Sequence, residues 1–296
     1  GSVTGVQTCA LPILSCSDPN QCGPKQDIYS RVAANTMQVI KRDTLSDDHE
    51  VAALAAWCVR VGIPRSLAKK PVMTYVYGAT LRGTAEHIET VLGKEVMPDV
   101  GEKWLDEFKT LEHCMYIAKK LFQGIAAAVP AAAQAMHWLK EIARQQPSGQ
   151  RMSWHTPTGF WVQHDYQDYT DNQVRLNSCG VVQVWVREWN EGTRAHAMRN
   201  AISPNFVHAL DASHLTMVAN AMAADNLAMV AIHDSFGTNP CDVDKMHQHI
   251  RQEFVNLYSG PNLLTEFLWE VNGVGEPPFR GSLDLLDVLD SEFMFC

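Results

Sequence analysis

The chain lacks the marks of a disulfide-rich or membrane-spanning protein. Its 296 residues include eight scattered cysteines, of which Cys16 and Cys22 are the closest pair, and no CxxC spacing typical of zinc or redox sites. No apolar run reaches the roughly 18 residues that a membrane span needs. These absences favour reduced thiols in an intracellular protein without a membrane partner. The 46% hydrophobic content is enough for a sizeable core, in one large or two smaller domains.

Acidic residues are missing from one window of an otherwise acidic chain. The formal net charge of -9 argues against a protein that binds nucleic acid by bulk positive charge. Residues 51–85, however, contain no Asp or Glu. They carry five basic residues, Arg60, Arg65, Lys69, Lys70 and Arg82. Such a window indicates a local anion site or a docking face, and a solvated helix face is the alternative.

The beginning of the sequence has neither an initiator methionine nor an early basic residue, since the first Lys or Arg is Lys25. Residues 3–13 resemble the in-frame translation of a sequencing adapter, so we expect residues 1–13 to be a non-native, adapter-derived segment. A secretory or lipoprotein signal is the alternative, because residues 14–16 faintly resemble a lipidation box, but such a signal needs a basic start. The sequence is therefore interpreted as a gene fragment that is cut at its 5′ end.

Apolar periodicity predicts a mostly helical first half. Helices are expected over residues 26–41, 47–61, 65–77, 104–122 and 130–144. Gly78 should end the third helix, because glycine tolerates the left-handed conformation that often follows a helix. Pro71 removes a hydrogen bond from a helix interior, so this helix should either begin near Pro71 or kink there.

The second half alternates between apolar and polar residues over residues 152–189, which predicts strands or hairpins. The polar residues 190–201 are expected to form a loop. Ser203 and Pro204 match the capping and first positions of a helix, which should run to about residue 224. A further helix over residues 243–257 and a compact tail over residues 282–296 are also expected.

The third helix presents a stripe of side chains suited to phosphate. Residues four apart on a helix share one face, and Arg65, Lys69, Met73 and Tyr77 have this spacing. Arg suits multi-point contact with phosphate oxygens, and Lys acts as a compact positive charge. Beside a leaving pyrophosphate, such cations stabilise the charge that develops during phosphoryl transfer. The acid-free surroundings and the pair Tyr77 and Gly78 favour this interpretation over a solvated basic face.

Two places could supply metal ligands. A short apolar run at residues 227–232 predicts a buried strand that delivers Asp234 to its end, where a carboxylate suits Mg²⁺. Taken alone, Asp234 also fits the role of a turn cap. His208, Asp211 and His214 lie three residues apart on one expected helix. These steps do not match the His-x3-His spacing of helical metal sites, so hydrogen-bonded interface side chains are favoured there.

Five ordered segments resemble the single-subunit, phage-type DNA-dependent RNA polymerases, most closely those of short-tailed phages. They are residues 26–29, after the first palm motif; residues 65–78, the fingers helix; residues 203–214, the helix returning to the palm; residues 232–237, the second palm motif; and residues 283–295, the C-terminal foot. The resemblance runs from about residue 25 to residue 296, which is nearly all of the chain outside the adapter-derived segment.

The resemblance implies an α+β, mostly helical, right-hand polymerase fold with a partial palm plus fingers. The implied domains are fingers over residues 14–213, with a β-hairpin specificity loop near residues 165–200, and a C-terminal palm and foot over residues 214–296. The implied partners are the DNA template and promoter, the nascent RNA and rNTPs. The resemblance further implies a monomer in the cytoplasm of an infected bacterial host.

The resemblance implies roles for the matching residues of the fingers and the returning helix. Arg65 and Lys69 would contact the triphosphate, with Lys69 also catalytic. Tyr77 would sense the ribose 2′-hydroxyl of the incoming nucleotide and clear the template path during translocation, and Gly78 would permit close packing there. His214 would read the 2′-hydroxyl side through the minor groove or through Tyr77.

Nucleotidyl transfer in this family, as the resemblance implies it, uses two metal ions and adds rNTPs to the RNA 3′ end. Asp234 would bind Mg²⁺, and His233 would support it. The upstream aspartate motif, with its adjacent Gly and Gln, would fall before residue 14 and is absent, as is the N-terminal promoter and RNA-exit domain. We therefore expect the fragment to be inactive by itself. Pro71 departs from the family pattern and affects the start of the fingers helix and the pose of Lys69.

The resemblance assigns promoter recognition to the hairpin at residues 174–186, which would read base edges in the major groove. Arg175 and Asn177 match positions that contact promoter bases. Trp185 and Arg187 stand where other members of the family place different polar residues, so the promoter should differ from theirs.

Three other interpretations remain open. A related single-chain DNA polymerase usually has an aromatic residue at position 73 and Glu at position 235, where this chain has Met73 and Ser235. These differences favour ribonucleotides. A non-catalytic nucleic-acid-binding module would bind without Mg²⁺. A misfolded truncation would expose a sheet edge and aggregate.

Overall fold

The computed structural model describes residues 27–93, 110–147, 149–176, 182–232, 235–281 and 283–291. Within them helices dominate, and the strands form three separate two-stranded antiparallel sheets, which agrees with the predicted α+β, mostly helical class. The helices are α2 (Ile28–Asp43), α3 (His49–Val61), α4 (Arg65–Tyr75), α5 (Leu81–Val91), α7 (Thr110–Ala128), α8 (Pro130–Gln145), α9 (Ala195–Ala224), α10 (Val243–Ser259), α11 (Leu263–Glu270) and α12 (Asp287–Asp290), with a 3-10 turn at Pro240–Asp242. The strands are β1 (Met152–His155), β2 (Trp161–His164), β3 (Gln167–Leu176), β4 (Val182–Thr193), β5 (Val230–Ile232) and β6 (Ser235–Gly237).

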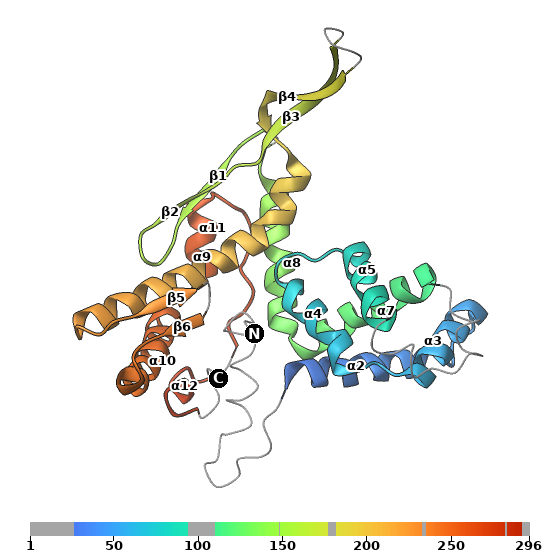
Figure 1. Cartoon of the computed structure of the whole chain (residues 1–296), viewed down its shortest axis with the longest axis horizontal. Coiled ribbons are helices and arrows are strands. Elements are labelled where there is room, and N and C mark those ends of the chain that lie inside the picture. Colours follow the sequence, from blue (N-terminus) through green and yellow to red (C-terminus); the bar gives the residue numbers. More distant parts are fainter. Residues whose placement is uncertain are drawn as a thin grey trace.

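A first group of helices, α2, α3, α4, α5 and α7, packs around one core on one side of the molecule (Figure 1). Asp27 caps α2 by accepting a hydrogen bond from the Ser30 amide, and Asp48 caps α3 in the same way. α7 lies against both α2 and α5. Where α7 meets α2, a Cβ atom on Gly124 would collide with Oγ1 of Thr36, so the two helices approach this closely only with glycine at position 124.

α4 begins at Arg65 and continues through Pro71, so the alternative in which it starts near the proline is wrong. Pro71 cannot donate a hydrogen bond to the carbonyl of Leu67, but both side chains are buried, and packing holds the helix together there. The helix ends at Tyr75, and Gly78 follows with a φ of 76°, the left-handed conformation predicted for it.

The described helices include none that alone has the length and apolar composition to cross a bilayer. α3 and α4 meet that test only as a pair, and the chain bends by 116° between them. Both helices bury side chains in the core of the first group.

A second group, α8, α9, α11 and the hairpin β1–β2, packs around another core. The loop predicted over residues 190–201 is wrong, as is the helix start at Ser203, because β4 and α9 occupy this segment and Pro204 lies inside α9. Tertiary contacts explain the difference. Met198 is buried in the core, and its carbonyl oxygen accepts a hydrogen bond of 2.9 Å from Nε2 of His164.

The strand predicted within residues 227–232 is present as β5, but the prediction that it is buried is wrong. Val230 is 64% exposed and Ile232 is 67% exposed. Among the described residues β5 pairs with β6 alone, so neighbouring strands do not cover it. Leu227 and Phe236 pack against a small core between α9 and α10. The apolar run therefore predicted the strand but not what covers it.

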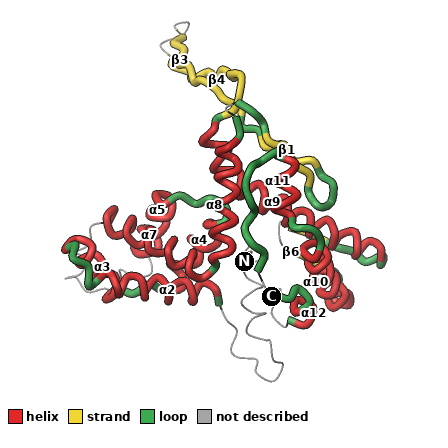
Figure 2. Tube along the Cα trace, turned by 180° about the vertical axis from the view of Figure 1, so that it is seen from behind, coloured by secondary structure: helices red, strands yellow, loops and turns green. Residues whose placement is uncertain are grey.

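The hairpin β3–β4 projects away from both helical groups (Figure 1), and the view from behind in Figure 2 shows the same arrangement. It lies within the stretch where a hairpin was predicted and leads directly into α9. Its register pairs Asp171 with Arg187 and Gln173 with Trp185. The hairpin is joined to the rest of the molecule mainly at its base.

Candidate functional site

α4 has one buried face and one exposed face that carries positive charge. Leu67 and Ala68 are fully buried and Val72 is 1% exposed, which fixes the helix against the first core. Arg65 and Lys69 lie one turn apart and are exposed. The first two positions of the predicted stripe are therefore presented to solvent, where they could contact phosphate oxygens.

Arg65 is held by an acid that the helical pattern did not reveal. Its Nε and Nη2 atoms donate to the two carboxylate oxygens of Asp27 at 2.5 and 3.2 Å, and its guanidinium carbon lies 4.9 Å from the ring centre of Tyr29. Burial acts to raise the pKa of the Asp27 carboxyl, but hydrogen bonds from Arg65 and Ser30 outweigh it, so the pKa is lowered. Arg65 is thus pre-oriented, and part of its charge is compensated.

The C-terminal end of the stripe, residues 73–77, lies where the cores of the two helical groups meet. Met73 packs against the core of the first helical group and Tyr75 packs against both cores, whereas Val76 belongs to the core around α8 and α9 and Tyr77 packs against it. The Tyr75 ring meets Phe122 of α7 edge to face, with centroids 5.3 Å apart. The segment after α4 therefore crosses from one group to the other, and Tyr77 lies at that junction.

Tyr77 and Gly78 form a corner that rests on α9, and we refer to these two residues as the Tyr77–Gly78 corner. The Tyr77 ring lies against His208, with centroids 4.7 Å apart and planes tilted by 40°. A Cβ atom on Gly78 would lie 3.0 Å from the carbonyl oxygen of Asn200, and the positive φ adds strain for any other residue. Glycine therefore suits this position on both counts.

His214 lies on the same helix but contacts α10 and β6, which are not part of the second group. Its ring is buried, Nε2 donates to the carbonyl oxygen of Ile250 at 2.8 Å, and Phe236 and Phe254 lie edge to face against it. Burial lowers the pKa of His214, although the hydrogen bond to Ile250 acts in the opposite direction. These contacts place the His214 side chain where α9 meets α10 and β6. The histidine whose ring lies against Tyr77 is His208.

His233 and Asp234 lie outside the described residues, between β5 and β6. The fit of a metal can therefore be tested only on their surroundings. Among the residues that the structure does describe, no group of three or more His, Cys, Asp or Glu side chains could hold a metal ion.

The two faces of the hairpin β3–β4 differ in chemistry. Cross-strand partners share a face, and so do alternate residues along a strand. One face carries polar, cationic and aromatic side chains: Tyr169, Asp171, Gln173 and Arg175 of β3, with Trp189, Arg187, Trp185 and Gln183 of β4. We call this the polar face. The opposite face carries the exposed valines Val174, Val184 and Val186.

The predicted DNA-contacting residues differ in how firmly they are held. Trp185 is 66% exposed and Arg175 is also exposed, whereas Asn177 lies outside the described residues. Arg187 is engaged within the hairpin, since it donates to both carboxylate oxygens of Asp171 at 2.9 and 3.2 Å and stacks 3.7 Å from the centre of the Tyr169 ring. Hydrogen bonding from Arg187 lowers the pKa of the Asp171 carboxyl.

Sequence reasoning missed the partners that hold these cations. Asp27 lies 38 residues from Arg65, and Asp171 lies 16 residues from Arg187. The second pair could have been found from the strand alternation once the turn position was known, because opposite residues share a face. The first pair has no local signal.

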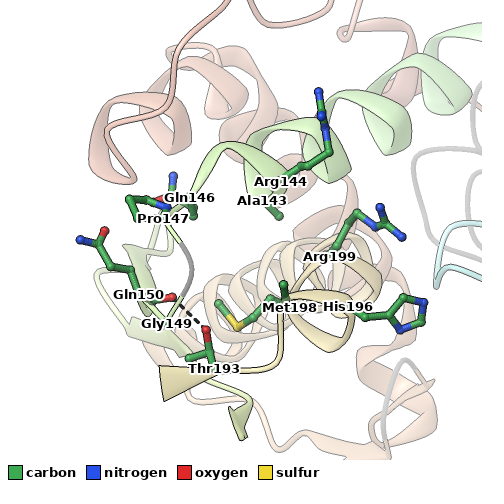
Figure 3. Close-up of a pocket in the computed structure, with 11 residues that line it drawn as sticks. Ala143, Arg144, Gln146, Pro147, Gly149, Gln150, Thr193, His196, Met198 and Arg199 are labelled. Atoms are coloured by element: carbon green, nitrogen blue, oxygen red, sulfur yellow. Dashed lines mark hydrogen bonds between the residues drawn. The ribbon is translucent and has the colours of Figure 1, made fainter. Parts of the chain in front are cut away.

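A cavity of about 190 Å³ lies away from all of these residues (Figure 3). It is bordered by the end of α8, the loop before β1 and the first turns of α9. Thr193 donates a hydrogen bond of 3.3 Å to the Gln150 carbonyl at its edge, and Arg144 and Arg199 lie at its border. None of the residues predicted to bind nucleotide or DNA lines this cavity.

Comparison with known proteins gives a consistent family. The chain is 38% identical over 277 residues to a DNA-directed RNA polymerase of Pseudomonas phage phiKMV, covering 92% of this chain and 33% of that protein. It is 34% identical to DNA-directed RNA polymerase 2, chloroplastic/mitochondrial, of Arabidopsis thaliana, covering 91% of this chain and 26% of that protein. A third relative, DNA-directed RNA polymerase 2A of Nicotiana tabacum, is 31% identical, with 91% and 80% covered.

The chain thus spans about a third or less of the length of the first two relatives. A family model described as DNA-dependent RNA polymerase matches residues 20–274. Since this match takes in both helical groups, α4 and the hairpin, the chain belongs to the DNA-dependent RNA polymerase family.

Proposed function

We propose that this chain supplies the nucleotide-selecting and DNA-reading parts of a DNA-directed RNA polymerase. The chain spans about a third of the phage relative, so nucleotidyl transfer from rNTPs to the RNA 3′ end is proposed for the longer polymerase. The observation that carries the proposal is the exposed cationic turn of α4 leading to the Tyr77–Gly78 corner, in a member of this family.

The proposed nucleotide contacts follow the direction of α4. Lys69 and the pre-oriented Arg65 bind the triphosphate and stabilise the charge on the leaving pyrophosphate. Tyr77, at the far end, senses the ribose 2′-hydroxyl, so the base and sugar would lie toward α9. His214 supports this arrangement from a distance, because its buried hydrogen bond to Ile250 fixes α9 against α10.

The proposed metal is Mg²⁺, held by Asp234 with support from His233. When bound, the ion would stabilise the negative charge of the transferring phosphoryl group, as one of the two metal ions of the proposed reaction. Within this proposal the residues of the chain bind and orient the nucleotide, and Lys69 supplies positive charge to the triphosphate.

The proposed DNA contacts include the polar face of the hairpin. Arg175 and Trp185 of that face meet promoter base edges together with Asn177, which lies outside the described residues, and Arg187 stiffens the hairpin through Asp171. The proposed partners are template and promoter DNA, nascent RNA and rNTPs, for a monomer in the cytoplasm of an infected bacterial cell.

Binding of MgATP and MgdATP to the chain, measured by calorimetry, tests the nucleotide site. Lys69→Ala is expected to weaken ATP binding about tenfold, or ~1.4 kcal/mol, because it removes a charge-assisted contact. Lys70→Ala is the matched control, since Lys70 is an adjacent exposed lysine turned about 100° around the helix. Equal losses for the two variants would contradict a site at Lys69.

Sugar selection is tested by the same measurement on Tyr77→Phe, which removes only the phenol hydroxyl. The variant is expected to bind ATP and dATP with more similar affinities than the original chain. An unchanged ratio would remove Tyr77 from sugar recognition.

A further inference from the structure

Two stretches of the chain without acidic residues meet at the cavity between α8 and α9. Residues 142–164 and 192–210 contain no Asp or Glu, although the whole chain has 33 of them. The first stretch takes in the end of α8 and the loop before β1, and the second takes in the end of β4 and the first half of α9. Both border the cavity shown in Figure 3, so negative charge is scarce around it.

Three cations gather at one edge of this cavity. Arg144 of α8 and Arg199 of α9 line it, and Figure 3 shows both side chains extending on the side away from Gln150 and Thr193. Lys140 lies one turn before Arg144 on α8 and therefore shares its face. Lys140 is also close enough to Arg199 for the two charges to repel each other. We call Lys140, Arg144 and Arg199 the α8–α9 cation cluster.

The protein neutralises only part of this cluster. Arg144 donates from Nε and Nη2 to one carboxylate oxygen of Glu141, at 2.8 and 2.7 Å. Within the part of the chain that the structure describes, Lys140 and Arg199 form no ion pair, and both are half-buried. Burial and then repulsion by Arg199 lower the pKa of Lys140. An anion bound in the cluster would offset this repulsion.

The position of the cluster indicates which anion it meets. β4 of the hairpin leads directly into α9, and Arg194 lies at this joint. The guanidinium carbon of Arg194 lies 4.4 Å from the centre of the Tyr169 ring, and that of Arg187 lies 3.7 Å from the same centre. Tyr169 and Arg187 belong to the polar face. Positive charge therefore continues from the proposed DNA-reading surface through Arg194 to Arg199, five residues farther along the chain.

We propose that Lys140 and Arg199, with Arg144 beside them, form a phosphate-binding site for one backbone phosphate of the DNA that meets the hairpin β3–β4. The inference rests on the proposed DNA-reading role of the hairpin. Arg can donate two hydrogen bonds to phosphate oxygens, and Lys adds a compact positive charge. A backbone contact of this kind fixes the position of the DNA and strengthens binding of all sequences alike. Inorganic phosphate offers the same oxygens, so the experiment separates the two sources.

The test measures binding of a random-sequence DNA duplex to the whole chain by fluorescence anisotropy at several salt concentrations. Arg199→Gln is expected to make the slope of log affinity against log salt shallower by about 0.9, because one phosphate contact is lost. Lys140→Gln is expected to act in the same way, and it decides the matter if Arg199→Gln does not fold. Arg199→Lys keeps the charge and should keep the slope. Arg42→Gln, which removes an exposed arginine at the end of α2, is the control and should also keep it.

An unchanged slope in folded Arg199→Gln would overturn the proposal, as would an equal loss in Arg42→Gln. Arg175→Gln, on the polar face, separates this site from the hairpin. A shallower slope in Arg199→Gln but not in Arg175→Gln would support the phosphate site and contradict DNA reading by the hairpin, and the reverse result would overturn the phosphate site alone. Inorganic phosphate, added at constant ionic strength, tests the other source. If it raises the melting temperature of the original chain but not of Arg199→Gln, while both bind the duplex with the same slope, the site takes free phosphate and the proposal is overturned.

Discussion

The Tyr77–Gly78 corner and the hairpin β3–β4 are held by different forces. The helix before the corner has Leu67 fully buried and Val76 2% exposed, so packing on both sides determines where the corner lies. On the hairpin, Trp185 is 66% exposed and Trp189 is 61% exposed. Cross-strand backbone hydrogen bonds hold the two strands together, and the exposed pair Asp171–Arg187 joins them on the polar face.

This difference separates two kinds of functional surface. Around the corner, a change of side-chain volume disturbs the packing of two helical groups, because interiors are close-packed. On the hairpin, most side chains meet solvent on both faces, so substitutions there cost little folding stability. The proposed nucleotide site is thus tied to the fold, whereas the proposed DNA-reading surface can change its chemistry while the fold is kept.

The largest effect is expected from shortening a side chain under the cationic stripe. Leu67→Ala should lower the free energy of unfolding by about 3 kcal/mol, through lost apolar burial and a residual cavity. Val184→Ala, on the hairpin, should lower it by less than about 0.5 kcal/mol, since Val184 is 39% exposed. Chemical denaturation followed by circular dichroism measures both. Similar losses for the two variants would show that the hairpin belongs to the same cooperative core as α4.

A smaller loss of folding stability is expected at acid pH, and its source should be two buried histidines, His164 and His214, that lie in or against α9. Burial lowers the pKa of His164 and of His214, although hydrogen bonds to backbone carbonyls act in the opposite direction. Both folded-state values lie below the unfolded value of about 6.5. The neutral rings therefore contribute stability that is fully present above that pH and is lost as the pH falls through the folded pKa. The urea midpoint should fall between about pH 7.5 and 5.5.

His214→Gln sharpens this prediction, because glutamine can still donate to the Ile250 carbonyl but cannot titrate in this range. The variant should be less stable than the original chain near neutral pH and should lose less on acidification. His49→Gln is the control, since His49 is exposed. The same pH dependence in the original chain and in His214→Gln would contradict the buried-histidine explanation.

Local patterns in the sequence predicted those parts of the fold that depend on one element. Four-residue spacing predicted the two exposed cations of α4, Arg65 and Lys69, the position of Gly78 predicted the left-handed end, and two-residue alternation predicted the hairpin. The start of α9 was missed because polar residues there suggested a loop. In the structure, Met198 of α9 is held by a hydrogen bond from His164 of strand β2. The exposure of β5 was missed because an apolar run carries no information about which neighbours cover it.

The candidate site shows the same division. Lys69 was placed correctly on one helix, because its spacing is local, whereas Tyr77 was expected on that helix and lies two residues beyond its end. The partners Asp27, Asp171 and His208 act across separations that only the fold creates, and His208 was interpreted only as an interface residue. Ion pairs and ring contacts between distant segments depend on register and helix packing, which composition does not determine.

The smallest effect on stability is expected from opening the pair on the polar face. Asp171→Asn should leave the denaturation midpoint unchanged, because both side chains are exposed. The substitution should still weaken the hold of residue 171 on Arg187, so that the guanidinium can contact DNA phosphate. Binding to a random-sequence DNA duplex is then expected to strengthen, with the slope of log affinity against log salt becoming steeper by about 0.9. Fluorescence anisotropy at several salt concentrations measures this slope.

Glu188→Gln is the matched control for the loss of one negative charge. Glu188 lies on the opposite face of the same strands, where it accepts a hydrogen bond of 2.8 Å from Asn172. If the steeper slope came from net charge alone, the two variants would behave alike, and the hairpin would act as a uniform charged ribbon. A slope that changes only in Asp171→Asn would mean that Arg187 is withheld from DNA by its partner. In that case sequence reading falls to Arg175 and Trp185, while Arg187 stays paired with Asp171 and joins the two strands of the hairpin.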